Sequence, residues 1–96
     1  MVTGGIPTRG AIAISRYGCG SCHTIGGISG ANGLVGPPLT GVGNRIYVAG
    51  SLPNNSENMI RWIENPHTIN EHTVMPNLAV THSDATDIAA YLYTLK

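Results

Sequence analysis

The sequence has few large side chains from which to build a core. Its 96 residues include no Phe, four Tyr and a single Trp, Trp62. Large aromatic rings usually dominate protein cores, and a chain of this length buries only about 60–65% of the surface that its unfolded form exposes. We therefore expect this chain to gain stability from an internal prosthetic group or a cross-link.

Charged residues are also scarce. Only 10% of the residues are charged, five basic side chains balance five acidic ones, and the single lysine is Lys96. This composition excludes the strongly basic surface expected of a nucleic-acid-binding protein.

Long apolar segments are absent as well. No apolar run approaches the roughly 18–20 residues that span a bilayer, and Met1–Gly10 lacks the charged and apolar regions of a signal peptide. We expect one domain over residues 1–96, with residues 1–7 as a flexible N-terminal extension. The chain is expected to be soluble, either cytosolic or exported with its signal or anchor already removed.

Apolar spacing and capping residues predict three helices. The first covers Thr8–Tyr17, the second covers about Ser56–Glu64 with Asn55 as its N-cap, and the third covers about His82–Leu95 with Thr81 as its N-cap. No segment alternates convincingly between polar and apolar residues, so strands are not predicted. The predicted fold is all-α, with about three main helices joined by long loops rich in Gly and Pro, such as residues 24–38.

The chemistry is concentrated in Cys19, Cys22 and His23, which have the spacing C-x-x-C-H. This spacing is typical of c-type haem attachment, in which two thiols add to the porphyrin vinyl groups and the adjacent histidine binds the iron. The motif uses both cysteines of the chain.

Three other interpretations of the motif compete with haem attachment. A structural disulfide would leave His23 without a role, and a thioredoxin-like redox motif would need a βαβ context that this helical pattern does not offer. A zinc site would need further ligands, for which His67 and either His72 or His82 are candidates.

A haem c domain of this length needs a second axial iron ligand. Met75 is the favoured candidate because it lies in a polar, proline-containing stretch, residues 73–78, with no core helix to support. Met59 instead falls on the apolar face of a predicted helix, where packing explains it. The candidates are Met1, Met59, Met75, His67, His72 and His82.

The sequence resembles the small, bacterial-type class I (monohaem) cytochromes c from about Thr8 to Leu95. Besides C-x-x-C-H, the resemblance is carried by these segments: Gly36-Pro37-Pro38-Leu39, residues 40–45 (TGVGNR), Met75-Pro76 and Ala90-Tyr91-Leu92. It implies the cytochrome c fold, in which the first and last helices cross at a small residue near Gly10 and the chain wraps one covalently bound haem. The lysine ring of the mitochondrial members is missing here.

The resemblance also implies roles for individual residues. Cys19 and Cys22 would hold the haem, His23 and Met75 would bind its iron, and the Pro37 carbonyl would accept a hydrogen bond from the His23 ring. Arg45 and Trp62, together with Tyr47, are expected near the haem propionates.

The expected function is one-electron transfer through a low-spin haem c, as a soluble shuttle or as the cytochrome domain of a larger respiratory oxidoreductase. Two filled axial positions argue against an enzyme. Expected partners are redox proteins such as a terminal oxidase, a quinol-oxidising complex or a dehydrogenase, and a membrane only through an anchor or a partner subunit. The expected location is the periplasm or the extracytoplasmic face of the membrane. The alternative is a gas sensor or weak peroxidase in which Met75 is labile.

Overall fold

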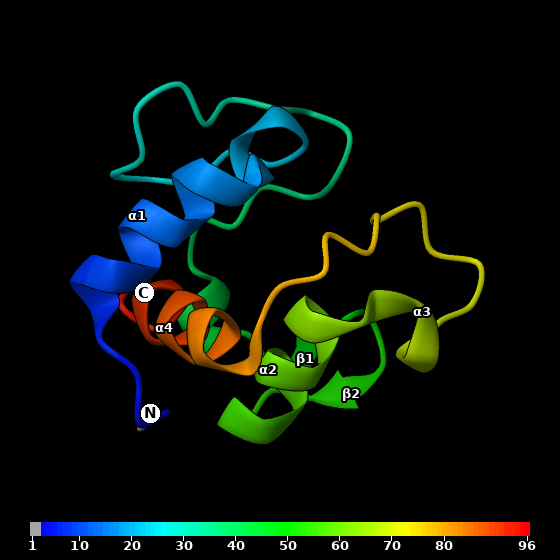
Figure 1. Cartoon of the computed structure of the whole chain (residues 1–96). Helices are drawn as coiled ribbons and strands as arrows, with labels where there is room; N and C mark the ends of the chain where they lie inside the picture. The colour runs from blue at the N-terminus through cyan, green and yellow to red at the C-terminus, as the bar shows by residue number, and fades with distance from the viewer. Residues whose placement is uncertain (1–2) are drawn as a thin grey trace.

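Three helices carry most of the regular structure: α1 (Pro7–Tyr17), α2 (Ser56–Glu64) and α4 (His82–Leu92). The computed structural model describes residues 3–96. Figure 1 shows α1 crossing α4 on one side of the molecule, with α2 next to α4 and the short helix α3 (Pro66–Ile69) at the far end. Among the described residues, no helix is both long and apolar enough to pass through a membrane.

Local sequence explains where these helices begin and end. Pro7 occupies the first turn of α1, and Gly18 ends the helix in the left-handed conformation at φ 76°. The Asn55 side chain accepts a hydrogen bond from the Asn58 amide at the start of α2, and the Thr81 side chain accepts one from the Asp84 amide at the start of α4. Both predicted N-caps are therefore confirmed.

The crossing of α1 and α4 depends on the absence of a side chain at Gly10. A Cβ atom there would lie only 2.0 Å from the carbonyl oxygen of Asp87 and 3.0 Å from the Cβ of Tyr91. The two backbones can approach this closely only with glycine at the contact. This contact is the helix crossing that the resemblance implied.

Polar groups tie the same two helices together beyond the crossing point. The Tyr17 hydroxyl donates to Asp84 Oδ2 over 2.7 Å, and Arg16 Nη2 donates to the same oxygen over 2.8 Å. The hydrogen bond from Tyr17 is the main reason that the pKa of Asp84 lies below its ordinary value. The last turn of α1 is therefore fastened to the first turn of α4.

The core lies between α1, α2 and α4 and is built from medium-sized aliphatic residues. Its most buried members include Ile14, Met59 and Ile88, each at most 2% exposed, and the described part of the chain has no buried polar or charged residue. Trp62, Tyr17 and Tyr91 pack against this core without being fully buried. Medium-sized aliphatic side chains thus take the place of the missing Phe.

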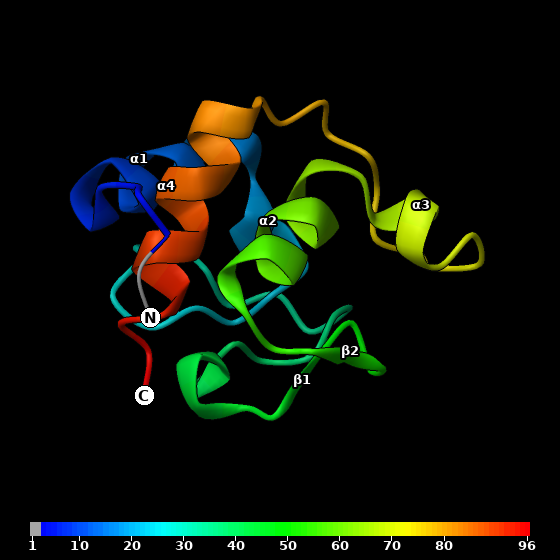
Figure 2. The ribbon, with the colours of Figure 1, turned by 90° about the horizontal axis from the view of Figure 1, so that it is seen from below.

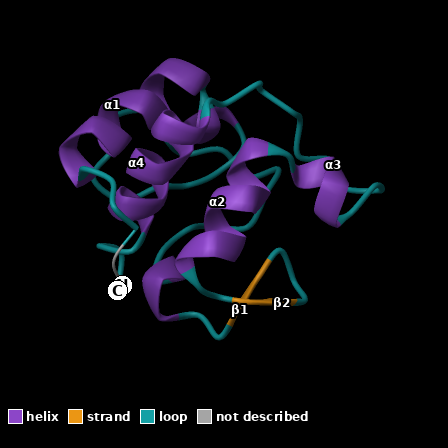
Figure 3. Cartoon of the chain, turned by 60° about the horizontal axis from the view of Figure 1, so that its bottom comes forward, coloured by secondary structure: helices purple, strands orange, loops and turns teal. Residues whose placement is uncertain are grey.

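The structure differs from the sequence predictions in a small hairpin and at the end of α4. The chain forms a small antiparallel hairpin from β1 (Tyr47–Val48) and β2 (Leu52–Pro53), shown in orange in Figure 3. Strands of two residues are too short to produce an alternating pattern, so the prediction of no strands was wrong here. α4 ends at Leu92 instead of Leu95, and the Leu95 carbonyl accepts a hydrogen bond from Gly43 instead of continuing the helix.

The residues before α1 also differ from the expected flexible extension. Pro7 belongs to α1, the Thr3 hydroxyl donates to the Thr86 carbonyl, and the Ile6 amide donates to Asp87 Oδ1 over 2.8 Å. Residues 3–7 therefore rest on α4, whereas residues 1–2 lie outside the described part of the chain.

Replacing Gly10 by Ala tests the helix crossing. The added methyl group has no space beside Asp87, so we expect Gly10→Ala to lower the free energy of unfolding by about 1–3 kcal/mol or more. Helix propensity alone would change stability in the opposite direction, by up to about 1 kcal/mol. Denaturant unfolding of the holoprotein measures the change. Gly26→Ala is the control, because a Cβ at Gly26 meets nothing within 4 Å; a Gly10→Ala protein as stable as this control would contradict the crossing.

Candidate haem site

The attachment motif lies in a tight turn that follows α1 directly. Residues Cys19–Ser21 form one turn of 3-10 helix, and the amides of Cys22 and His23 donate to the Cys19 carbonyl over 3.2 and 3.1 Å. The Ser21 hydroxyl donates to the Gly18 carbonyl over 2.6 Å. These bonds bring Cys19, Cys22 and His23 into one compact turn at the end of a well-anchored helix.

Cys19 and Cys22 are both half-buried and are not joined to each other by a disulfide. Burial raises the pKa of the Cys19 thiol. Within residues 3–96, no three His, Cys, Asp or Glu side chains lie close enough together to hold a metal ion, so His67, His72 and His82 do not complete a zinc site with the cysteines. The described thiols form no disulfide either.

The His23 ring is held in a defined orientation by the segment that follows. Nδ1 of His23 donates to the Pro37 carbonyl over 2.7 Å, the contact that the resemblance implied. The Nδ1 proton fixes the tautomer and leaves the lone pair of Nε2 available for a metal. Binding of iron by this nitrogen stays a prediction.

Gly36 allows the proline segment to reach the ring, a role that sequence analysis did not assign to it within the Gly36-Pro37-Pro38-Leu39 segment. A Cβ at Gly36 would lie 2.4 Å from Cε1 and 2.8 Å from Nδ1 of His23. The Gly36 amide also donates to the Cys22 carbonyl over 2.7 Å. The motif Gly36-Pro37 therefore supplies both the space and the acceptor that orient the imidazole.

The candidate second ligands differ in their surroundings. Met59 is 2% exposed within the core, where packing fully accounts for it, whereas Met75 is half-buried in the loop before α4. His67 and His72 are exposed, and His82 is paired with Glu64. Met1 lies outside the described residues. These environments favour Met75, and its role as a ligand stays a prediction.

The three residues predicted near the propionates occupy different surroundings. Nη2 of Arg45 donates to the carbonyls of Pro38 and Thr40, so the guanidinium lies next to the proline segment that orients His23. Trp62 is half-buried against the core, and Tyr47 is 59% exposed on the hairpin. No hydrogen bond joins Arg45, Tyr47 and Trp62 in the described structure.

Sequence reasoning missed Asn54, which positions the Arg45 segment. Its Nδ2 donates to the carbonyls of Val42 and Arg45 over 3.0 and 2.8 Å, and its Oδ1 accepts the Tyr93 hydroxyl over 2.7 Å. Asn54 lies in a polar turn, where asparagine is common, so the sequence carried no signal for this role.

Exposed apolar side chains are concentrated in the two segments that carry the candidate ligands and their supports. Eight large apolar residues are exposed in the described chain, and six of them fall within residues 34–47 and 74–78: Leu34, Val35, Ile46, Tyr47, Val74 and Leu78. An apolar macrocycle would cover such side chains. The two cysteines and the oriented His23 imidazole form a donor set that fits haem c, and these apolar side chains are candidates for contact with its ring.

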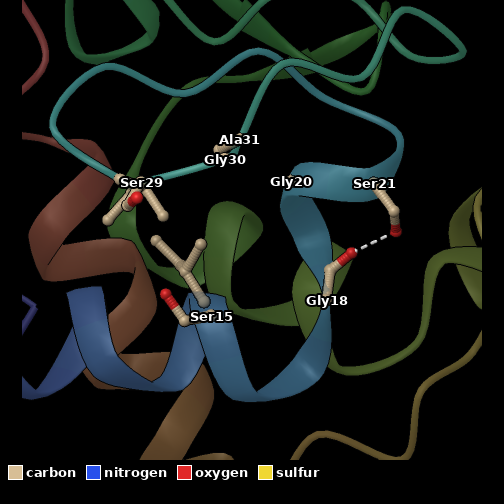
Figure 4. A pocket seen from close by; sticks show the side chains of 9 residues that line it. Ser15, Gly18, Gly20, Ser21, Ser29, Gly30 and Ala31 are labelled. Atoms are coloured by element: carbon tan, nitrogen blue, oxygen red, sulfur yellow. Dashed lines mark hydrogen bonds between the residues drawn. The ribbon is translucent and has the colours of Figure 1, made fainter.

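A shallow pocket beside the attachment turn is separate from this site. It is lined by the end of α1 and the loop at residues 28–31, and Figure 4 shows Ser15, Ser21 and Ser29 among its lining residues. Neither cysteine nor His23 lines it. The pocket therefore reflects the fold around the turn and not the cofactor site.

Comparison with known proteins agrees with this geometry. The family model "Cytochrome c" matches residues 8–96. The chain belongs to the cytochrome c family. Its fold is similar to that of cytochrome c2 from Rhodobacter sphaeroides, with a TM-score of 0.63, 23% identity and coverage of 95% of this chain and 96% of that one.

The chain also matches part of a longer relative. It is 34% identical to cytochrome c oxidase subunit 2 from Alkalihalophilus pseudofirmus over 92 aligned residues, and the aligned region covers 95% of this chain. The chain spans about a quarter of that relative's length, 26%. As a cytochrome c, the protein binds haem c covalently and carries electrons.

Acid–acetone extraction tests which residues hold the haem. A thioether bond survives this treatment, so the colour of the wild-type protein is expected to stay with the precipitated chain. In a variant with both Cys19→Ala and Cys22→Ala, any haem that is bound should pass into the solvent. Each single variant keeps one thioether and should retain the colour. Extraction of haem from the wild-type protein would contradict attachment through these cysteines.

Proposed function

We propose that this cytochrome c transfers single electrons through a low-spin haem attached to Cys19 and Cys22 and ligated by His23 and Met75. The contact between His23 Nδ1 and the Pro37 carbonyl carries the proposal, because it presents Nε2 as a preoriented ligand next to both thiols. The bound haem supplies the redox-active iron. All other steps depend on how the chain orients and shields it.

The two proposed iron ligands, His23 and Met75, would affect the haem in different ways. The carbonyl of Pro37 makes the His23 imidazole a stronger donor and limits its rotation. A thioether from Met75 favours reduced iron relative to a second nitrogen ligand, and so raises the reduction potential. His23 and Met75 would together hold the iron and would leave no ligand position for a substrate, so we propose a carrier and not an enzyme.

The charges of the cofactor need partners as well. Arg45 is exposed and its guanidinium lies beside the segment that orients His23, which suits a propionate carboxylate nearby. Trp62 and Tyr47 each offer one further donor, from the indole nitrogen and the phenol. We propose these three side chains as the propionate partners.

Replacing the two internal methionines separately tests the ligand assignment. Met75→Ala should abolish the weak red absorption band of a thioether bonded to ferric iron, and it should lower the potential by more than about 0.1 V, a small part of the roughly 0.8 V that axial ligands span. Met59→Ala should keep the band and instead lower the free energy of unfolding by about 2–5 kcal/mol.

Optical and magnetic spectra of the two variants distinguish the outcomes. Loss of the band in Met59→Ala alone would transfer the ligand to Met59. A high-spin spectrum of the wild-type protein at neutral pH would overturn the carrier proposal in favour of a sensor or weak peroxidase with labile Met75.

For the acceptor, we propose a terminal oxidase, with the chain acting as the cytochrome domain of an oxidase subunit on the extracytoplasmic side of the membrane. The 34% identity to a cytochrome c oxidase subunit 2 over nearly the whole chain supports this context more than a free shuttle. Residues 19–36 and 74–80 contain no Lys, Arg, Asp or Glu. Leu34, Val35 and Val74 are 89%, 71% and 82% exposed, which suits an apolar rim around the haem edge.

The salt dependence of electron transfer tests this docking mode. Opposite charges speed association at low salt, and screening beyond roughly 8–10 Å removes the effect at physiological ionic strength. Because the proposed rim is uncharged, the second-order rate with a solubilised terminal oxidase should change by less than about threefold between low and high salt. A decrease of tenfold or more at high salt would show that charges outside the rim control docking.

A further inference from the structure

Among the described residues, the loop that carries Met75 makes hydrogen bonds to the rest of the molecule only at its two ends. It joins α2 to α4 through residues 65–81. Its hydrogen bonds are local, such as Met75 amide to Thr73 hydroxyl and Ala79 amide to Asn77 Oδ1. Among the described residues, none of the hydrogen bonds of residues 66–80 reaches beyond residue 65 or 80.

Burial within this loop follows the same pattern. Pro66 and Val80 are buried, and no residue between them is. Figures 1 and 2 show α3 and the loop that follows it directly at the end of the molecule opposite α1. A segment with few buried contacts and no outside hydrogen bonds opens at a low free-energy cost compared with the core.

One pair of side chains joins the two residues that flank this loop. Glu64 is the last residue of α2 and His82 is the first residue of α4, and His82 Nδ1 donates to Glu64 Oε1. The Glu64 side chain is only 30% exposed, whereas that of His82 is 79% exposed. The pair thus joins the two positions at which the loop leaves and re-enters the packed helices.

We infer that Glu64 and His82 form a clasp that keeps Met75 on the iron. The inference rests on the proposed ligation by Met75. The inference requires that the movement of the loop when Met75 leaves the iron extends to its two ends, where it breaks the pair. Glu64 and His82 are positioning residues, because they act on the iron only through the loop between them.

The size of the effect follows from the exposure of the pair. A solvent-exposed ion pair changes an equilibrium by about two- to fivefold, since its free energy is close to RT. A competing ligand binds only the open form, so its apparent dissociation constant equals the intrinsic constant divided by the open fraction. Loss of the clasp should therefore tighten the binding of an external ligand by the same factor.

The chain offers matched controls for this test. His72 and Glu71 form a second His–Glu pair, with 3.4 Å between His72 Nε2 and Glu71 Oε1, but both lie inside the loop and bridge nothing. The pair of Arg16 with Asp84 joins α1 to α4 and does not touch the loop. His72→Ala thus controls for the residue type, and Arg16→Ala controls for a general loss of stability.

The experiment is a titration of the ferric holoprotein with imidazole, followed by loss of the thioether band. We expect the dissociation constant for imidazole to fall by about two- to fivefold in His82→Ala and in Glu64→Gln, and to stay at the wild-type value in His72→Ala and Arg16→Ala. The double variant Glu64→Gln/His82→Ala should bind no more tightly than either single variant, because both remove the same contact.

Two results would overturn the clasp. One is an imidazole affinity of His82→Ala and Glu64→Gln equal to that of His72→Ala. The other is additive effects in the double variant, which would mean that the two residues act separately. A failure of the ligand assignment is distinguishable, because the wild-type protein would then have no thioether band before imidazole is added.

Discussion

The close approach of α1 and α4 at Gly10 is the constraint on which the rest of the structure depends. Cys19, Cys22 and His23 follow the end of α1 directly, and the Met75 loop ends at the start of α4. The position of one helix on the other therefore sets where the attachment motif and the Met75 loop lie. Next to this crossing, the contacts of Arg16 and Tyr17 with Asp84 join the last turn of α1 to the first turn of α4.

The two sides of the site are built with very different rigidity. On the histidine side, backbone hydrogen bonds fold the attachment turn, and the Pro37 carbonyl fixes the ring. On the methionine side, the chain from residue 66 to residue 80 makes only local hydrogen bonds and has no buried residue between Pro66 and Val80. This division motivates the proposal that the Glu64–His82 pair acts on Met75 through the loop between them.

The composition of the chain also makes sense in terms of the cofactor. Without Phe, the described core consists of medium-sized aliphatic residues, and Leu34, Val35 and Val74 stay exposed. A covalently bound haem supplies a large apolar ring to a chain too small to bury much of its own surface. Residues 19–36 and 74–80 contain no Lys, Arg, Asp or Glu, which agrees with the proposal of a domain tethered to its acceptor.

The sequence by itself determined the local features of this protein. Spacing marks Cys19, Cys22 and His23 as an attachment motif, and the capping side chains of Asn55 and Thr81 fix the starts of two helices, because these patterns depend on neighbours within a few residues. Only the tertiary structure decided that Gly36 makes room for the His23 ring, that Asn54 holds the Arg45 segment, and that Glu64 meets His82. Those contacts join residues 9 to 18 positions apart through turns and helix packing. No periodicity or spacing rule encodes them, since each depends on where the folded chain brings two backbones together.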